Sequence, residues 1–352
     1  MTWDEIRAGR LARNHLLGRA PAERLVEVVR DVCGIHAQVM GSAELQLAAR
    51  VDGITQAEVR AALWERRVLA KTWTLRGTLH VHPSDELSLW TAARRAVVGP
   101  ADHESDELEN VEEVVAAIGE ALRGRTLTRE ELADAVVERV GQGPREKLAS
   151  GWGFYLGGAA EAGELVFGPP QGQRVTFVHP EDWLGLQPPW EPGEALREVA
   201  RRYAETYGPV TYREFRQWFT SRHLTAATAR ELFESIDLPE WEPVEPRATV
   251  RLLPEYDVYV MGFREREHLV PPEVRELVAA HGKGRYEGPA GTPFLVIDGL
   301  CAGIWRRSKT ARKLELTVEP VRGLTRGERE ALGDEARRLG SFFGLEPALR
   351  TA

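Results

Sequence analysis

Apolar residues recur at helical spacing in two stretches near the start of the chain. Residues 22–33, AERLVEVVRDVC, carry apolar side chains three or four positions apart, which places them on one face of a helix. Residues 55–69 show the same spacing, and Thr55 with Glu58 forms a capping box at their start. The pattern predicts two amphipathic helices, the first of which ends at Gly34.

A β-hairpin is predicted directly after the second helix. In residues 71–83, KTWTLRGTLHVHP, apolar and polar side chains alternate on both sides of Arg76-Gly77, a pair that can form a tight turn. Helices followed by a hairpin are the plan of a winged helix, which is a helix-turn-helix with a β wing.

The same order of elements recurs further along the chain. Residues 124–140 predict a helix capped by Thr128 and Glu131, residues 144–163 predict another helix, and residues 164–178 predict a hairpin with a longer Gly/Pro loop. The order of helix, helix and hairpin indicates a second winged-helix unit.

A third copy is predicted in the following residues. It has a helix at 208–220 capped by Thr211 and Glu214, a helix at 225–236, and a strand at 248–253. Three divergent copies of such a unit would form a DNA-binding array.

The C-terminal pattern differs from these units. Residues 293–321 alternate strand-like segments around the turn Asp298-Gly299, and residues 325–344 predict a closing helix. We therefore expect a small antiparallel sheet packed against one helix. The predicted fold class is mainly α with β-hairpins, made of tandem winged-helix units and a C-terminal β-rich subdomain. The expected domains are winged-helix units at 1–100, 101–190 and 191–247, followed by the subdomain at 248–352.

Charge qualifies the prediction of DNA binding. The 352 residues carry a net charge of −8, but residues 101–120 alone hold eight carboxylates and no Lys or Arg. Residues 305–313, WRRSKTARK, concentrate basic side chains instead. Phosphate binding depends on such a local positive face and not on the charge of the whole chain. A solvated surface is the alternative interpretation of this basic cluster.

Two cysteines far apart, Cys33 and Cys301, favour free thiols in a reducing cytosol. No apolar run reaches the length of a membrane span, and the N-terminal residues do not resemble a signal peptide. We expect a cytoplasmic, nucleoid-associated protein without a membrane partner.

The candidate chemistry lies at His36-Ala37-Gln38, just past the first helix. An imidazole can accept a proton near neutral pH, and an amide can orient a water molecule as donor and acceptor. Their side chains point to one side only if the backbone is extended there, which the turn at Gly34 permits. Alternatively, both side chains only bind backbone groups at the helix end.

Metal chemistry is not expected. His80 and His82 have the spacing of metal ligands on one strand face, but no cysteine or carboxylate cluster accompanies them. Residues 168–173, GPPQGQ, lack the pattern of a phosphate-binding glycine loop. We therefore predict neither a metal site nor a cofactor.

Four parts of the chain resemble the AlkZ/YcaQ-like family of winged-helix DNA glycosylases. They are GIHAQ at 34–38, TWTLRGTLHVHP at 72–83, YGPVTYREFRQW at 207–218, and VRLLPEYDVYVMGFRER at 250–266 with DGLCAGIWRR at 298–307. The resemblance spans nearly the whole chain. It implies tandem winged-helix units around a basic channel for duplex DNA, and hydrolytic removal of alkylated purines of the N7-alkylguanine type, including bulky natural-product adducts or cross-links.

In that family, catalysis depends on a glutamine, one apolar residue, and then a glutamine or aspartate. The resemblance carries these roles onto His36, Ala37 and Gln38, so this sequence departs from the family by a histidine at the first position. Because N7 alkylation already makes the base a good leaving group, a positioned water is sufficient. No lysine lies in the motif to form a Schiff base, which favours a monofunctional glycosylase over a lyase.

DNA contacts are expected from the predicted wing and from the basic cluster. The expected residues are Arg76, Thr78, His80, Arg306, Arg307, Lys309 and Lys313. Arg76 could instead be only a turn residue. The alternative function is a non-catalytic winged-helix DNA-binding protein, either a regulator or a damage sensor. A regulator usually dimerises, and no segment resembles a dimerisation helix, so we expect a monomeric enzyme.

Overall fold

The computed structural model describes residues 1–97, 108, 110–150, 153–221, 223–281 and 291–352. Within these residues the protein is mainly helical, with small sheets and a curled C-terminal β half-barrel. The chain divides into two compact units. The first unit comprises residues 1–59, 202–218 and 237–352, and the second comprises residues 60–201 and 219–236.

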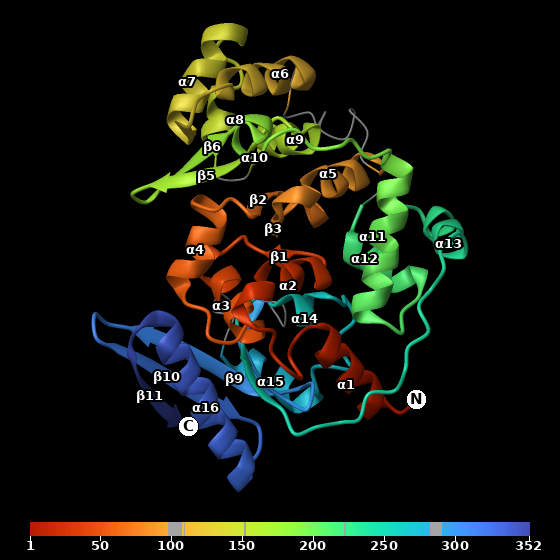
Figure 1. Cartoon of the computed structure of the whole chain (residues 1–352), viewed down its shortest axis with the longest axis vertical. Helices are drawn as coiled ribbons and strands as arrows, with labels where there is room; N and C mark the ends of the chain where they lie inside the picture. Colours follow the sequence, from red (N-terminus) through yellow and green to blue (C-terminus); the bar gives the residue numbers. More distant parts are fainter. Residues whose placement is uncertain (98–107, 109, 151–152, 222, 282–290) are drawn as a thin grey trace. The chain divides into compact units, whose positions relative to one another are not determined.

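The first unit contains a five-stranded sheet in the order β11–β10–β9–β8–β7. Figure 1 labels β9, β10 and β11 of this sheet. Its strands are β7 (Val250–Leu253), β8 (Phe294–Ile297), β9 (Leu300–Lys309), β10 (Lys313–Pro320) and β11 (Glu346–Thr351). Along β10, buried Leu314, Leu316 and Val318 alternate with more exposed residues, so one face of the strand is core. Helix α16 (Arg326–Phe343) packs against β7 and β11.

The remaining elements of the first unit are helices and one short strand, most of them in its N-terminal segment. They are α1 (Trp3–Arg13), the short 3₁₀ helix η1 (Ala22–Arg24), α2 (Leu25–Asp31), β1 (Ile35–His36), α3 (Met40–Arg50), α14 (Val258–Met261) and α15 (Pro272–Ala280). Three helices begin in one unit and end in the other: α4 (Gln56–Trp64), α11 (Pro192–Tyr207) and α12 (Tyr212–Phe219). Among the described residues, no helix combines the length and apolar composition that a bilayer-spanning segment requires.

The predicted antiparallel C-terminal sheet is confirmed for β8 to β10 but is wrong at one edge. Strands β8 and β9 pair antiparallel around Asp298-Gly299, and β9 pairs antiparallel with β10. Strand β11, which was not predicted, pairs in parallel with β10. A parallel pair needs a crossover connection, and α16 supplies it. The sequence EPALRT has no apolar alternation that would have indicated this strand.

The third helix–helix–hairpin copy has no hairpin among the described residues of 191–247. The strand predicted at 248–253 at the end of that copy is β7, which pairs antiparallel with β8 and so lies in the C-terminal sheet, within the expected subdomain at 248–352. The preceding residues 237–249 form no strand that could pair with it. Pro239, Pro243 and Pro246 interrupt this stretch, and each lacks the backbone donor that a strand ladder requires.

Ion pairs of a buried carboxylate, Glu335, connect α16 to other parts of the first unit. Glu335 is 3% exposed and forms ion pairs with Arg19, Arg251 and Arg338. Burial alone would raise the pKa of Glu335, but the three guanidinium groups hold it below its ordinary value. The carboxylate therefore stays charged and holds the helix against β7.

The second unit contains both predicted hairpins. Strands β2 (Leu69–Trp73) and β3 (Leu79–Pro83) pair antiparallel around the 3₁₀ turn η2 (Leu75–Gly77). A second sheet has the order β4–β6–β5, with β4 (Leu127–Thr128), β5 (Val166–Gln171) and β6 (Arg174–Val178). The predicted long Gly/Pro loop is instead a two-residue turn, because β5 includes both prolines beside a register shift.

The helices of the second unit are η3 (Ser84–Glu86), α5 (Leu87–Arg95), α6 (Val111–Leu122), α7 (Arg129–Val140), α8 (Arg145–Ala149), α9 (Phe154–Ala162), α10 (Pro180–Leu184) and α13 (Ala226–Glu234). Of these, α6, α7, α8 and α9 share an apolar core with the hairpin strands. The capping box predicted at Thr128 and Glu131 is confirmed at the start of α7. Trp73, Ile118, Val136 and other side chains of these elements form the core.

The single helix predicted over 144–163 is broken into α8 and α9. Ser150 leaves the helical conformation, and Gly153 has φ 84°, a left-handed backbone that favours glycine. A Cβ at Gly153 would lie 2.8 Å from the indole nitrogen of Trp73. The break therefore lets α9 approach the hairpin that carries Trp73.

Candidate active site

The turn after α2 redirects the chain toward the predicted catalytic motif. Cys33, with φ 63°, donates from its backbone N–H to the Arg30 carbonyl at 3.1 Å, and Gly34 donates to the Val29 carbonyl at 2.9 Å. This pair of bonds is a Schellman motif with cysteine in the left-handed position. The helix end predicted at Gly34 is therefore confirmed, although the last helical residue is Asp31.

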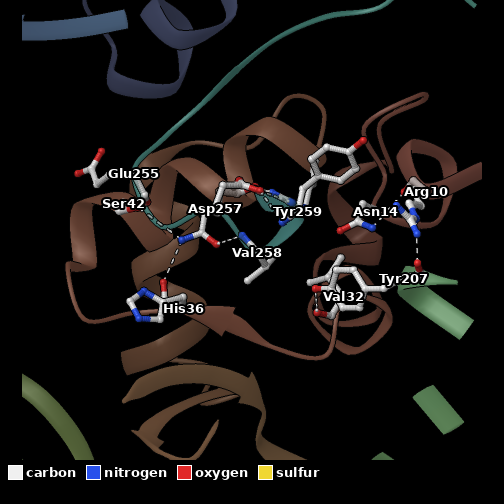
Figure 2. A network of polar contacts seen from close by, with 12 residues as sticks. Arg10, Asn14, Val32, His36, Ser42, Tyr207, Glu255, Asp257, Val258 and Tyr259 are labelled. Atoms are coloured by element: carbon white, nitrogen blue, oxygen red, sulfur yellow. Dashed lines mark hydrogen bonds and ion pairs between the residues drawn. The ribbon is translucent and has the colours of Figure 1, made fainter. Parts of the chain in front are cut away.

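The C-terminal end of α11 holds this helix end in place. The Tyr207 hydroxyl donates to the Val32 carbonyl at 3.1 Å, and Thr206 donates to the Asp31 carbonyl at 2.5 Å. Arg10 in turn donates from Nε to the Tyr207 carbonyl at 2.9 Å (Figure 2). Burial lowers the pKa of Arg10. These bonds satisfy carbonyl groups that a helix end leaves without an intrahelical partner.

His36 and Gln38 differ in exposure. His36 ends the two-residue strand β1 and is 4% exposed, whereas Gln38 is exposed in the bend before α3. The imidazole packs against the ring of Tyr256, with 5.2 Å between ring centroids. Tyr256 has φ 58°, a left-handed conformation that costs a bulky residue about 1–3 kcal/mol and is concentrated at functional sites.

Gln46 joins the main chain of His36 to α14. Its Nε2 donates to the His36 carbonyl at 2.9 Å, and its Oε1 accepts from the Val258 backbone N–H at 3.3 Å. Figure 2 shows this chain of bonds between His36 and Val258. The side chain of Gln46 is fully buried on α3. The amide therefore connects two segments that are remote in the sequence.

A buried ion pair fixes the same two segments. Arg50 donates from Nη1 and Nη2 to the two carboxylate oxygens of Asp257, at 2.8 and 2.7 Å, and neither side chain is exposed. Arg50 also donates to the Gln46 carbonyl, and Asp257 caps α14 by accepting from the Tyr259 N–H. The fork and these additional bonds pair the two charges with each other and with backbone groups, although Nε of Arg50 has no hydrogen-bond partner within the described part of the chain.

Arg307 lies beside the start of α3. Its guanidinium is 3.5 Å from the carboxylate of Glu255, and a Cβ added to Gly41 would lie 3.8 Å from its Nη2. Ser42 donates to the Glu255 carbonyl (Figure 2). One residue of the basic cluster therefore lies close to the residues that follow Gln38.

The other basic residues of this cluster have different neighbours. Arg306 forms an ion pair with Glu319 at 2.6 Å. Successive residues of β9 point to opposite faces, so Arg306 and Arg307 diverge. Lys309 lies over the ring of Phe343 at 4.1 Å, and Lys313 is exposed at the start of β10. The cluster is thus not a single continuous face.

In the second unit, Arg76 lies at the tip of the predicted wing. It is half-buried, has φ 58°, and donates from Nη2 to Nε2 of His80 at 3.3 Å. His80 donates from Nδ1 to the carbonyl of Thr78 at 3.1 Å, so these bonds require the neutral tautomer with a proton on Nδ1. His80 is thus a buried support for Arg76.

His82 also belongs to the interior of the hairpin. Its ring stacks on Trp90 with 4.3 Å between centroids, and its Nε2 bonds the Thr74 hydroxyl at 2.9 Å. Within the described ranges, no group of His, Cys, Asp and Glu side chains could hold a metal ion. Residues 101–107 and 109 of the predicted acidic segment lie outside the described residues.

Several residues of this site carry no signal in the sequence. Gln46, Arg50, Tyr256 and Asp257 occur in no catalytic motif, and only the family-like stretch at 250–266 drew attention to the last two. Their importance follows from contacts between distant segments.

Comparisons with known proteins agree over almost the whole chain. A family model for AlkZ-like DNA glycosylases matches residues 29–342. The interstrand DNA cross-link repair glycosylase of Streptomyces sahachiroi is 30% identical over 386 residues, which cover 98% of this chain and 97% of that protein. The solved structure of the S. sahachiroi DNA glycosylase AlkZ superposes with a TM-score of 0.82 at 26% identity, and the alignment covers 100% of both chains.

The buried pair provides a test of how the loop is supported. We expect Asp257→Ala to lower the free energy of unfolding of the first unit by about 3–5 kcal/mol, because it leaves the Arg50 charge buried without its partner. Replacing both residues, as in Arg50→Met with Asp257→Leu, should restore part of the loss. Urea unfolding measures the effect. Glu330→Ala, which removes an exposed ion pair with Arg326, is the control and should change stability little. Equal effects of Asp257→Ala and the control would contradict this role.

Proposed function

Because the chain belongs to the AlkZ-like family of DNA glycosylases, we propose that it hydrolyses the N-glycosidic bond of N7-alkylguanine and related alkylated purines in double-stranded DNA. The cross-link repair named for the Streptomyces relative supports a substrate range that includes bulky adducts and interstrand cross-links. Such an activity begins base excision repair at the nucleoid in the cytoplasm. It would also give self-resistance to a cell that makes a DNA-alkylating compound.

The observation that carries the proposal is the arrangement around His36. A buried imidazole is held on its main chain by Gln46 and on its ring by Tyr256, while exposed Gln38 follows two residues later. An ionisable base and an amide two residues apart are groups that can accept a proton from a water molecule and orient it. The histidine at the family's glutamine position is therefore compatible with catalysis.

We propose that His36 is the general base and Gln38 orients the water. The oxygen of this water bonds to C1′ of the damaged nucleotide as the bond from C1′ to the purine nitrogen breaks. The electron pair of the broken bond neutralises the cationic base, so the leaving group needs no protonation. His36 takes the proton of the water.

DNA binding is assigned to the hairpin of β2 and β3 and to the basic strand β9. Arg76 at the hairpin tip is the best supported contact, because His80 holds it, whereas the carboxylate of Glu255 partly offsets the charge of Arg307. Lys309, Lys313 and Thr78 remain proposed phosphate contacts. His80 would act through Arg76, and Arg306 would contribute less because Glu319 offsets its charge. The helix–helix–hairpin units would serve as winged-helix modules.

Removing the imidazole of His36, the proposed general base, should remove most of the excision activity. We expect His36→Ala to lower the excision rate by roughly 10²–10⁴-fold with little change in DNA affinity. His36→Gln, which restores the family's residue, should keep part of the rate because an amide can still hold water. Release of free base from a duplex with one N7-methylguanine measures the rate, and His223→Ala at an exposed position is the control. Binding of this duplex without any base release by the parent would favour the alternative of a damage sensor.

The rate should depend on pH in a way that His36 determines. An imidazole that already carries a second proton cannot accept a proton from water. Excision by the parent protein should therefore fall toward acidic pH, whereas His36→Gln should lose this dependence. Single-turnover rates between about pH 5 and pH 8 test this, and identical profiles would exclude His36 as the base.

The hairpin tip should contribute to binding without regard to damage. Arg76→Ala should weaken binding to damaged and undamaged duplex alike and reduce the salt dependence by about one phosphate contact. Fluorescence anisotropy at several salt concentrations measures both quantities. Arg60→Ala, at an exposed position of α4, is the matched control. An unchanged salt slope for Arg76→Ala would mean that Arg76 is only a turn residue.

A further inference from the structure

Gln46 has an arrangement that core packing alone does not require. It is fully buried, yet its amide is used at both ends: the nitrogen donates to the His36 carbonyl at 2.9 Å, and the oxygen accepts from the Val258 N–H at 3.3 Å. These two partners lie 10 and 212 residues away in the sequence. Only a side chain with a donor and an acceptor on one planar group makes both bonds, and Asn is one methylene too short for the same reach.

The bond to His36 constrains the imidazole through the main chain. A hydrogen bond to the carbonyl limits rotation of the adjoining peptide, and the direction of the Cα–Cβ bond follows from the backbone. The ring itself packs on Tyr256, which lies two residues before Val258. The ring of His36 therefore contacts the segment 255–258 directly, and its main chain is connected to that segment through Gln46.

That segment is in turn fixed to the helix that carries Gln46. Asp257 lies between Tyr256 and Val258 and is bound by Arg50, one helical turn after Gln46. Arg50 also donates to the Gln46 carbonyl at 3.0 Å. Gln46 thus connects the ion pair of Arg50 and Asp257 to the backbone of His36.

We infer that Gln46 is a positioning residue for the base His36, and that it fixes the imidazole against α14 in the orientation that proton transfer requires. This inference rests on the proposed function. It assigns no contact with DNA to Gln46, so its loss should alter the chemical step and not the binding of substrate. A displacement of the base by about 1 Å can cost about 10²-fold in rate.

The test is a double-mutant cycle on the full-length chain with a duplex that carries one N7-methylguanine. Gln46→Met introduces an apolar side chain of similar length to glutamine, and it removes both bonds. In the parent background it should lower the single-turnover rate by about 10–100-fold, with the duplex Kd changed less than about twofold and the pH dependence from His36 weakened. In the His36→Ala background the same substitution should change the rate less than about twofold, because the residue through which it acts is gone.

Gln56→Met is the matched control. Gln56 is also a glutamine of the first unit and bonds the carboxylate of Glu44 at 2.5 Å. Its replacement should leave the rate unchanged. Gln46→Leu decides the question if Gln46→Met does not fold. It also removes both bonds and buries no charge, and the same loss of rate is expected.

The outcomes separate the two proposals. An equal loss from Gln46→Met in the parent and His36→Ala backgrounds, or no loss in the parent, overturns the positioning role and leaves the glycosylase function standing. Release of no base by the parent overturns the proposed function, and the role of Gln46 with it. A rate loss confined to the parent background supports both.

Discussion

The arrangement of the candidate active site depends on the buried ion pair between Arg50 and Asp257. Taking both charges out of water is costly, and the cost is offset only while the two-pronged geometry is kept. The pair therefore tolerates little sliding of α3 against the residues before α14. Because Gln46 and Val258 adjoin the two partners, this restriction extends to the main chain of His36. A rigid polar contact in the interior thus determines where an otherwise short loop can lie.

The sequence predicted what local interactions determine. The caps at Thr55 and Thr128 and the hairpin at 71–83 each depend on residues within a few positions, and all are present. The errors in the assignment of strands to the C-terminal sheet involve distant partners. Strands β7 and β11 pair with strands that lie far away in the chain. In neither strand does an alternation of apolar and polar residues indicate which strand is its partner. Gln46 and Arg50 look like ordinary helix residues until Asp257 and Val258 are placed beside them.

The basic cluster shows a different limit. Its composition indicated a positive surface, but alternation along β9 sends Arg306 toward Glu319 and leaves Arg307 near Gly41. Which side chains of β10 lie next to Arg306 and Arg307 depends on the register of β9 with β10, and the amino-acid composition of the cluster does not determine that register. The histidines of the wing are a similar case, because their spacing resembles metal ligands while their contacts are with Arg76, Thr74 and Trp90. Residue type indicated the chemistry of these positions, and tertiary contacts determined its use.

The separation of 207 positions between Arg50 and Asp257 has a consequence for biosynthesis. Chains emerge from the ribosome at about 5–20 residues per second, so His36 and Gln38 are exposed for on the order of ten seconds or more before Asp257 is made. During this interval the segment with His36 and Gln38 lacks two contacts. The Val258 N–H that binds Gln46 has not been made, and neither has the ring of Tyr256. A nascent or prematurely terminated chain therefore carries the motif but not its support. Completion of the C-terminal half is therefore the step that supplies Asp257, Val258 and Tyr256 to the segment around His36.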